Sequence, residues 1–177
     1  MVPCVRGADP GPKAQTAGGS RALGHDEEMA WRALARAFVV VPRVLEGELQ
    51  AHHGLTLTEY SVLANLSDHS MRMTELAERG AMSLSAISRV ADRLAGAGLI
   101  ERAKCPSDAR GCLVVLTDAG AERLRAAHPT HVHGVREHVL SHLAGMDLGA
   151  LADAVSRFAS SGAPQARLAS LSSGSRI

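Results

Sequence analysis

The apolar residues of this 177-residue chain recur at helical spacing through most of its middle part. In residues 26–53 an apolar side chain returns every three or four positions, which predicts a long amphipathic helix. The stripe consists of Trp31, Leu34, Phe38, Val41 and Leu45. Acidic residues at 26–28 suit the positive end of this helix, whereas Pro42 should kink or break it and Gly54 should end it.

Two shorter helices are predicted next. Residues 56–69 begin with Thr56 and Glu59 at the spacing of a capping box, in which each residue satisfies a backbone N–H of the other. Residues 73–80 form a short helix that ends at Gly80.

The helix that follows, in residues 83–98, has two contrasting faces and a favourable N-cap at Ser83. The face expected to be buried consists of Leu84, Ile87, Val90, Ala91 and Leu94. The polar face consists of Ser85, Ser88, Arg89 and Arg93. This segregation indicates a helix that packs on one side and offers the other side to solvent or to a partner.

After residue 98 the spacing of the apolar residues changes from helical to strand-like. Two strand-like runs, 99–105 and 112–117, flank a turn-rich segment and predict a β-hairpin. Thr117 caps a further helix, expected over 119–145 with a disturbance at Pro129. A last helix in 147–160 carries an apolar stripe of Leu148, Leu151, Val155 and Phe158. The predicted fold class is therefore mainly α with a small β-hairpin wing, a winged helix-turn-helix with flanking dimerisation helices.

This order of elements gives one domain with two tails. Residues 1–24 and 161–177 are rich in Gly, Pro and Ser without apolar periodicity, and we expect them to be disordered. The ordered body is predicted over 25–160, and its helix-turn-helix and hairpin form a winged lobe at about 55–117. The long end helices carry more apolar surface than so small a module can bury, which predicts a homodimer.

Composition narrows the class of protein further. Aromatic residues make up only 2% of the chain, which disfavours a β-sandwich or barrel, and the net charge of +1 carries no argument for nucleic acid by itself. The sequence contains neither an apolar run of membrane-spanning length nor a secretory signal, so we expect a cytoplasmic protein. It also contains no P-loop, HExxH or nucleophile-elbow pattern, so we expect no enzyme.

A helix-turn-helix offers its second helix to the major groove of DNA. Ser83, Ser85 and Ser88 are short enough for a close approach to bases or phosphates, and Arg89 and Arg93 share one face. The wing is expected to add Arg102 and Lys104 on phosphates and Arg110 in a minor groove. Asp108 could orient Arg110 or pair with another arginine. The local basic excess is small, so shape and motif carry this prediction.

Three segments resemble the MarR family of bacterial transcription regulators. They are SLSAISRVADRLAGAGLIER, DAR in the wing, and LTDAG at the entry to the next helix, and the likeness extends over about Trp31 to Phe158. The resemblance implies a homodimer that binds double-stranded DNA at a pseudo-palindromic operator. It also implies a small effector, often an aromatic acid or phenol, between the dimerisation helices and the DNA-binding lobe. The family's wing often reads Asp-x-Arg-Arg, whereas Gly111 follows Arg110 here, which leaves one basic contact fewer.

The effector pocket that this resemblance implies has several candidate residues. An arginine beside an apolar cleft can hold a carboxylate with two hydrogen bonds. The candidates are Trp31, Arg36, His52, His53 and Tyr60. The alternative is that Trp31 lies in the core or dimer interface and the arginine is simply exposed.

Two sensing alternatives and one different class stay open. His138 and His142 stand four residues apart and could hold zinc together, with His52 and His53 completing the site. Cys105 and Cys112 lie on the two strands of the predicted wing, where oxidation could bridge them as a redox switch. The remaining alternative is a winged-helix protein-interaction module that does not bind DNA.

Overall fold

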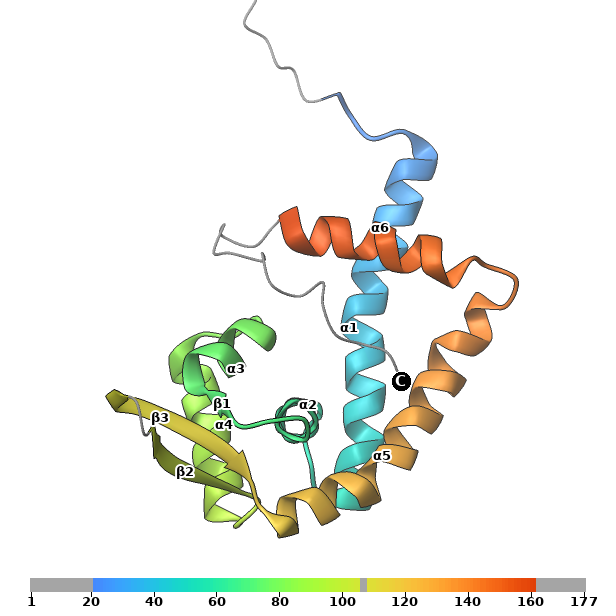
Figure 1. The fold of residues 1–177 in the computed structure, drawn as a ribbon. Coiled ribbons are helices and arrows are strands. Elements are labelled where there is room, and N and C mark those ends of the chain that lie inside the picture. Colours follow the sequence, from blue (N-terminus) through green and yellow to red (C-terminus); the bar gives the residue numbers. More distant parts are fainter. Residues whose placement is uncertain (1–20, 106–107, 162–177) are drawn as a thin grey trace, which may run out of the picture. The chain divides into compact units, whose positions relative to one another are not determined.

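A computed structural model describes residues 21–105 and 108–161 of the chain, without side chains for 104–112 and 159–161. The elements shown in Figure 1 are α1 (His25–His53), α2 (Leu57–Leu66), β1 (Met71–Arg72), α3 (Met73–Arg79), α4 (Leu84–Gly96), β2 (Ile100–Cys105), β3 (Asp108–Leu116), α5 (Asp118–His138), the 3-10 helix η1 (Leu140–Leu143) and α6 (Leu148–Ser161). This mainly helical order with a small antiparallel sheet confirms the predicted fold class. The chain divides into two units, 1–37 and 38–177, and the boundary falls inside α1.

The predicted tails fall mostly outside the described part of the chain. Of the expected disordered arm, residues 21–24 are described and lead without regular structure into α1. Of the expected tail, only residue 161 is described, as the end of α6.

The predicted helix caps are present. The Thr56 side chain accepts a hydrogen bond from the Glu59 backbone N–H, while the Glu59 carboxylate accepts from the Thr56 backbone N–H, so the capping box at α2 is complete. Ser83 caps α4, where its hydroxyl accepts from the Ala86 N–H at 3.2 Å. Thr117 caps α5 in the same way through the Gly120 N–H at 3.0 Å.

Helices α3 and α4 form the helix-turn-helix. The turn passes through Ala81, whose φ of 48° lies in the left-handed region that favours glycine. The Met82 N–H donates to the Ala77 carbonyl at 2.9 Å and closes the turn. The turn therefore fixes α4 on α3 through the backbone.

The sheet has three strands in the order β1-β3-β2. Strand β2 pairs antiparallel with β3, with Ile100 opposite Leu116 and Arg102 opposite Val114, which confirms the predicted hairpin. Strand β1 pairs with the other edge of β3, with Met71 opposite Val114. The sequence did not predict β1, because a strand of two residues has no readable alternation.

The hydrophobic core lies within the second unit. It joins the C-terminal part of α1 to α2, α3, α4, the sheet and α5. Its fully buried side chains are Leu49, Leu63, Met71, Leu76, Ile87, Leu94, Ile100 and Val114. One core, built mainly from aliphatic side chains, therefore connects the helix-turn-helix and the sheet to α1 and α5.

Neither Pro42 nor Pro129 breaks its helix. Helix α1 continues through Pro42, and α5 continues through Pro129. A proline removes one hydrogen bond of the helix, but nearby residues still pack. Leu45 and Leu49, which follow Pro42, are buried, and so are Ala127 and Gly134 on the two sides of Pro129. The predicted helix 119–145 instead ends at His138, and η1 follows after Val139, whose backbone is not helical.

Much of the apolar surface predicted for dimerisation is exposed in this single chain. In the first unit Met29, Trp31 and Leu34 are exposed. In the second unit the exposed large apolar residues outside the winged lobe are Phe38, Val39, Val40, Val44, Leu140, Met146, Leu148 and Phe158. Of the predicted stripe of α1, only Leu45 is buried. Among the residues that the structure describes, no helix combines the length and apolar character needed to cross a membrane.

Candidate nucleic-acid interface and adjoining pocket

Helix α4 has a buried and a polar face, largely as its sequence predicts. Ile87, Val90, Ala91 and Leu94 are buried, whereas Ser85, Arg89 and Arg93 are exposed and Ser88 is half-buried. Leu84 is the exception: it was expected to face inward, but 52% of it is exposed. The reason is that Leu84 is the first residue of α4, where the helix has not yet reached the core.

The three serines have different surroundings. The Ser83 hydroxyl is occupied by capping and lies 3.1 Å from the Ser85 hydroxyl. The Ser88 carbonyl accepts from the Arg102 guanidinium at 3.5 Å, at the limit of a hydrogen bond. Ser83 is thus occupied by the helix cap and Ser88 is half-buried, whereas Ser85 is exposed and does not cap the helix.

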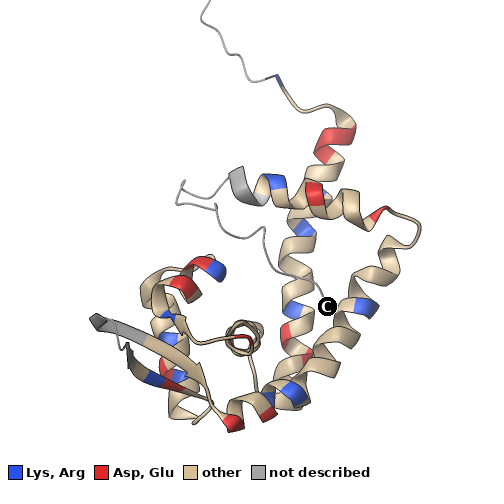
Figure 2. Cartoon of the chain, viewed as in Figure 1, with Lys and Arg blue, Asp and Glu red and all other residues tan. Residues whose placement is uncertain are grey.

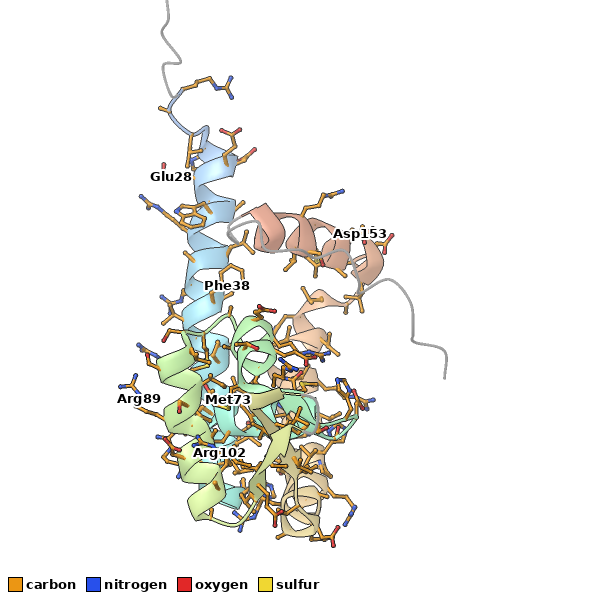
Figure 3. All side chains as sticks on the ribbon, turned by 60° about the vertical axis from the view of Figure 1, so that its left-hand side comes forward. Glu28, Phe38, Met73, Arg89, Arg102 and Asp153 are labelled. Carbon is orange, nitrogen blue, oxygen red and sulfur yellow. The ribbon has the colours of Figure 1, made fainter. Side chains whose placement is uncertain are left out.

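The three arginines around α4 also differ. Arg93 Nε lies 3.0 Å from Glu59 Oε1, and Arg102 Nη2 lies 2.6 Å from Asp92 Oδ1. Within the described part of the chain, Arg89 has no ion pair, and Figure 3 shows its side chain extending away from α4. Figure 2 shows both basic and acidic positions on α4 and on β2. The sequence placed Arg93 and Arg102 on DNA but did not anticipate their carboxylate partners.

The side chains of Lys104, Asp108 and Arg110 lie outside the described residues, although their backbones belong to β2 and β3. The same holds for the side chains of Cys105 and Cys112. The backbone register pairs Cys112 with Lys104 and Cys105 with Asp108, so the two cysteines are not opposite each other. The redox switch stays a prediction, without the cross-strand pairing on which it was based.

An open pocket of about 640 Å³ lies between α2 and α5. Most of its lining is apolar, with a few polar groups. The lining residues are Tyr60, Ala64, Ser67, Leu116, Ala121, Leu124, Arg125, His128 and Pro129. Of the predicted pocket residues only Tyr60 lines it. The α5 residues were missed, although Ala121, Leu124, Arg125 and His128 recur at the three- and four-residue spacing of one helix face.

The other predicted pocket residues lie elsewhere. Trp31 and Arg36 are exposed in the first unit. His53 Nε2 is hydrogen-bonded to Thr130 Oγ1 at 2.8 Å and helps to join α1 to α5, while His52 is exposed. The predicted set is thus not one cluster around this pocket.

Tyr60 connects α2 to α5 beside the pocket. Its hydroxyl is hydrogen-bonded to His128 Nδ1 at 2.9 Å, and its ring stacks on His131 with 4.4 Å between the ring centres. Burial raises the pKa of Tyr60. Burial also lowers the pKa of His131, with a further contribution from nearby His128. The neutral forms of both rings are therefore favoured at this contact.

The structure does not reproduce the spacing behind the predicted zinc pair. His138 is the last residue of α5 and His142 belongs to η1, so they are not four apart on one α-helix. His138 Nε2 instead lies 2.7 Å from Glu48 Oε1 of α1, and His142 is exposed. Among the described residues, no three His, Cys, Asp or Glu side chains come together as a metal site.

The entry to α5 explains the LTDAG segment physically. The Thr117 hydroxyl donates to the Gly98 carbonyl at 2.8 Å, and the Thr117 N–H donates to the Leu99 carbonyl at 3.2 Å. A Cβ on Gly120 would lie 2.0 Å from that same Leu99 carbonyl oxygen. Only glycine permits this approach, which connects the wing to α5.

The helix-turn-helix, the hairpin packed beside α4 and the long helices on either side define a winged helix-turn-helix protein. Residues 55–112 match the MarR family model. AbsC, a MarR family transcriptional regulator from Streptomyces coelicolor, is 37% identical, with 80% of this chain and 97% of AbsC covered and a TM-score of 0.75. Sco3205, a MarR family regulator from the same organism solved in complex with DNA, is 32% identical, with coverage of 81% and 96% and a TM-score of 0.77.

A curated relative is more distant. The uncharacterized HTH-type transcriptional regulator YhjH of Bacillus subtilis is 29% identical over 119 residues, which are 66% of this chain and 67% of YhjH. The two Streptomyces regulators match almost over their full lengths. This chain therefore belongs to the MarR family of transcriptional regulators. The family relationship confirms the resemblance and the prediction of a regulator instead of an enzyme.

Proposed function

We propose that this chain is a homodimeric repressor that binds a pseudo-palindromic operator and releases it when a small effector binds. The observation that carries the proposal is the polar face of α4. It is exposed in a helix-turn-helix beside a wing, in a chain 32% identical to a regulator solved on DNA. In such modules the N-terminal part of the second helix meets base edges in the major groove.

Within α4, Ser85 and Arg89 are the proposed groove contacts. Both are exposed. Within the described residues Arg89 forms no ion pair, so it can bind a phosphate or a guanine edge without breaking one. Ser83 and Ser88 have short side chains, which allow the DNA to approach this helix closely. In the wing, Arg110 is proposed for the minor groove, Lys104 for a phosphate and Asp108 for the orientation of Arg110.

The homodimer is supported by the exposed apolar side chains of the second unit. Val39, Val40 and Val44 of α1 and Leu148 of α6 all stay exposed in a single chain. An exposed apolar surface of this kind is what a soluble chain buries against a partner. Two copies related by a two-fold axis would present two α4 helices to the two half-sites of a palindromic operator.

The effector is proposed to bind in the pocket between α2 and α5. Its apolar lining with Arg125, His128 and the Tyr60 hydroxyl at the edge suits a small aromatic acid or phenol. Helix α2 also contacts the recognition helix, because Glu59, the residue before Tyr60, is paired with Arg93 of α4. A ligand that moves α2 would thus change the orientation of α4, and with it the distance between the two recognition helices of a dimer.

The decisive experiment is salt-dependent binding to DNA by fluorescence anisotropy. The probe is a duplex that the chain selects from a random-sequence library, with a scrambled duplex as control. We expect affinity for the selected duplex to fall steeply with salt and to drop at least tenfold in the double variant Arg89→Ala, Arg110→Ala. An intact dimer that enriches no sequence from the library would overturn the proposal and favour a protein-interaction module.

A further inference from the structure

The carboxylate of Glu59 uses its two oxygens for two different helices. Oε2 accepts from the Thr56 N–H at 2.8 Å and from the Thr56 hydroxyl at 2.9 Å, which caps α2. Oε1 lies 3.0 Å from Arg93 Nε of α4. Only 8% of Glu59 is exposed, although it carries a carboxylate. Buried carboxylates are stable when they are fully paired, and this one is paired on both oxygens.

The ion pair joins opposite ends of two helices. Glu59 belongs to the first turn of α2, and Arg93 belongs to the last turn of α4. Because the capping box already fixes the carboxylate, only the arginine has to be ordered to form the pair. A preoriented, shielded acceptor makes such a pair stronger than one between two free surface side chains. The pair therefore fixes the far end of the recognition helix to α2.

We propose that Arg93 is a positioning residue, which acts on DNA affinity through Glu59 by holding α4 in its binding orientation. The inference rests on the proposed DNA-binding function, and it replaces the expectation that Arg93 contacts DNA. If Arg93 turned to a phosphate, it would leave the buried Glu59 carboxylate without its cationic partner, which is costly. Arg89 lies about 6 Å closer to the N-terminal end of α4 and, within the described residues, has no carboxylate partner.

The two roles of Arg93 predict opposite effects of Glu59→Gln. If Arg93 contacts DNA, removing a negative charge beside it strengthens the attraction to phosphates, and affinity rises. If Arg93 positions α4, the same change loosens the helix and affinity falls. The glutamine keeps the shape of the side chain and an oxygen for the Thr56 N–H, so the cap is largely retained.

The test is binding of the selected duplex between 50 and 200 mM salt by wild type, Glu59→Gln, Arg93→Gln and the double variant. We expect each single change to lower affinity by roughly 3- to 10-fold, the usual range for a partly shielded pair, and the double variant to lose no more than either one. The slope of log affinity against log salt should stay that of wild type in all three. Arg89→Gln, the contact variant, should instead reduce that slope by about 1.

Ser61→Ala is the matched control, because it removes an exposed hydroxyl from α2 without touching the ion pair or the cap. It should leave the affinity of the folded protein within twofold of wild type. The inference is overturned if Glu59→Gln leaves affinity unchanged or raises it, if Arg93→Gln lowers the salt slope by about 1, or if Ser61→Ala weakens binding as much as Glu59→Gln. Failure of the wild type itself to bind the selected duplex would be the failure of the proposed function.

Discussion

The hydroxyl of Tyr60 and Nδ1 of His128 lie 2.9 Å apart and join α2 to α5, and both residues line the pocket. The residue before Tyr60, Glu59, holds Arg93 of the recognition helix. Helix α2 is therefore in contact with the pocket on one side and with α4 on another. This arrangement gives a physical route by which a ligand beside Tyr60 could act on DNA binding, and it leads to the predictions below.

Tyr60→Phe should lower the free energy of unfolding by about 1 kcal/mol, because it removes the hydrogen bond to His128 but keeps the ring on His131. Urea unfolding followed by circular dichroism measures the change. The control is Ser61→Ala, which removes an exposed hydroxyl that bonds within α2 and should change stability by less than about 0.5 kcal/mol. Equal stability of Tyr60→Phe and wild type would show that the tyrosine hydroxyl is equally well satisfied by water.

His131 should make the protein less stable in mild acid. Its pKa in the folded state is lowered, first by burial and then by His128, whereas in the unfolded chain a histidine titrates near 6.5. The unfolded state therefore binds more protons than the folded state as pH falls below about 6.5, and this binding favours unfolding. Above that pH both states hold a neutral His131, and the penalty is absent.

The variant His131→Phe isolates this effect, because it keeps a ring against Tyr60 and cannot be protonated. The melting temperature of wild type should fall further between pH 7.5 and 5.5 than that of the variant. The other histidines are present in both proteins, so the difference between the two reports on position 131. Parallel curves for the two proteins would contradict the prediction.

Three glycines in or at helices should respond to alanine in a fixed order. Gly120→Ala should cost about 2 kcal/mol or more, because its Cβ would lie 2.0 Å from the backbone oxygen of Leu99. Gly134→Ala should cost less, because the groups it meets are the ends of the Glu48 and Leu45 side chains, at 2.4 and 2.8 Å. Gly47→Ala, with nothing within 4 Å, should stabilise α1 by about 0.5–1 kcal/mol. Thermal unfolding of the three variants checks the order, and a tolerant Gly120→Ala would contradict it.

If the protein is the homodimer proposed above, Phe38→Asp should shift it from dimer to monomer in sedimentation experiments. Phe38 is 56% exposed in the single chain, and its ring meets Phe158 edge-on with 6.2 Å between the ring centres. A carboxylate on this apolar surface would have to be desolvated in a dimer interface. Asp153→Ala, at an exposed polar position of α6, should stay dimeric. A dimeric Phe38→Asp variant with wild-type helicity would place the dimer interface elsewhere.

The amino-acid sequence by itself determined the order of the helices, the caps at Thr56, Ser83 and Thr117, the hairpin and the family. These features are local: a cap needs a side chain and a backbone N–H three residues apart, and an amphipathic helix shows its buried face in the spacing of its apolar residues. The motif of α4 and the LTDAG segment were readable for the same reason. The residues of the polar face of α4 were predicted correctly. Leu84 was wrongly assigned to the buried face, because it is the first residue of the helix and lies before the turns that pack on the core.

Only the tertiary structure decided which partners the polar groups find. Tyr60 and His128 are 68 positions apart, and nothing in their neighbourhoods along the chain signals the contact. The same holds for Arg93 with Glu59, for Arg102 with Asp92, and for His138 with Glu48, where the sequence suggested DNA or zinc instead. A charged side chain pairs with whatever group the packed helices bring within reach, and that depends on how α2, α4 and α5 are oriented by their buried apolar faces. For this reason the sequence located the candidate DNA-binding helix, while the structure showed that Arg93 and Arg102 are paired with carboxylates and that Arg89, within the described residues, is not.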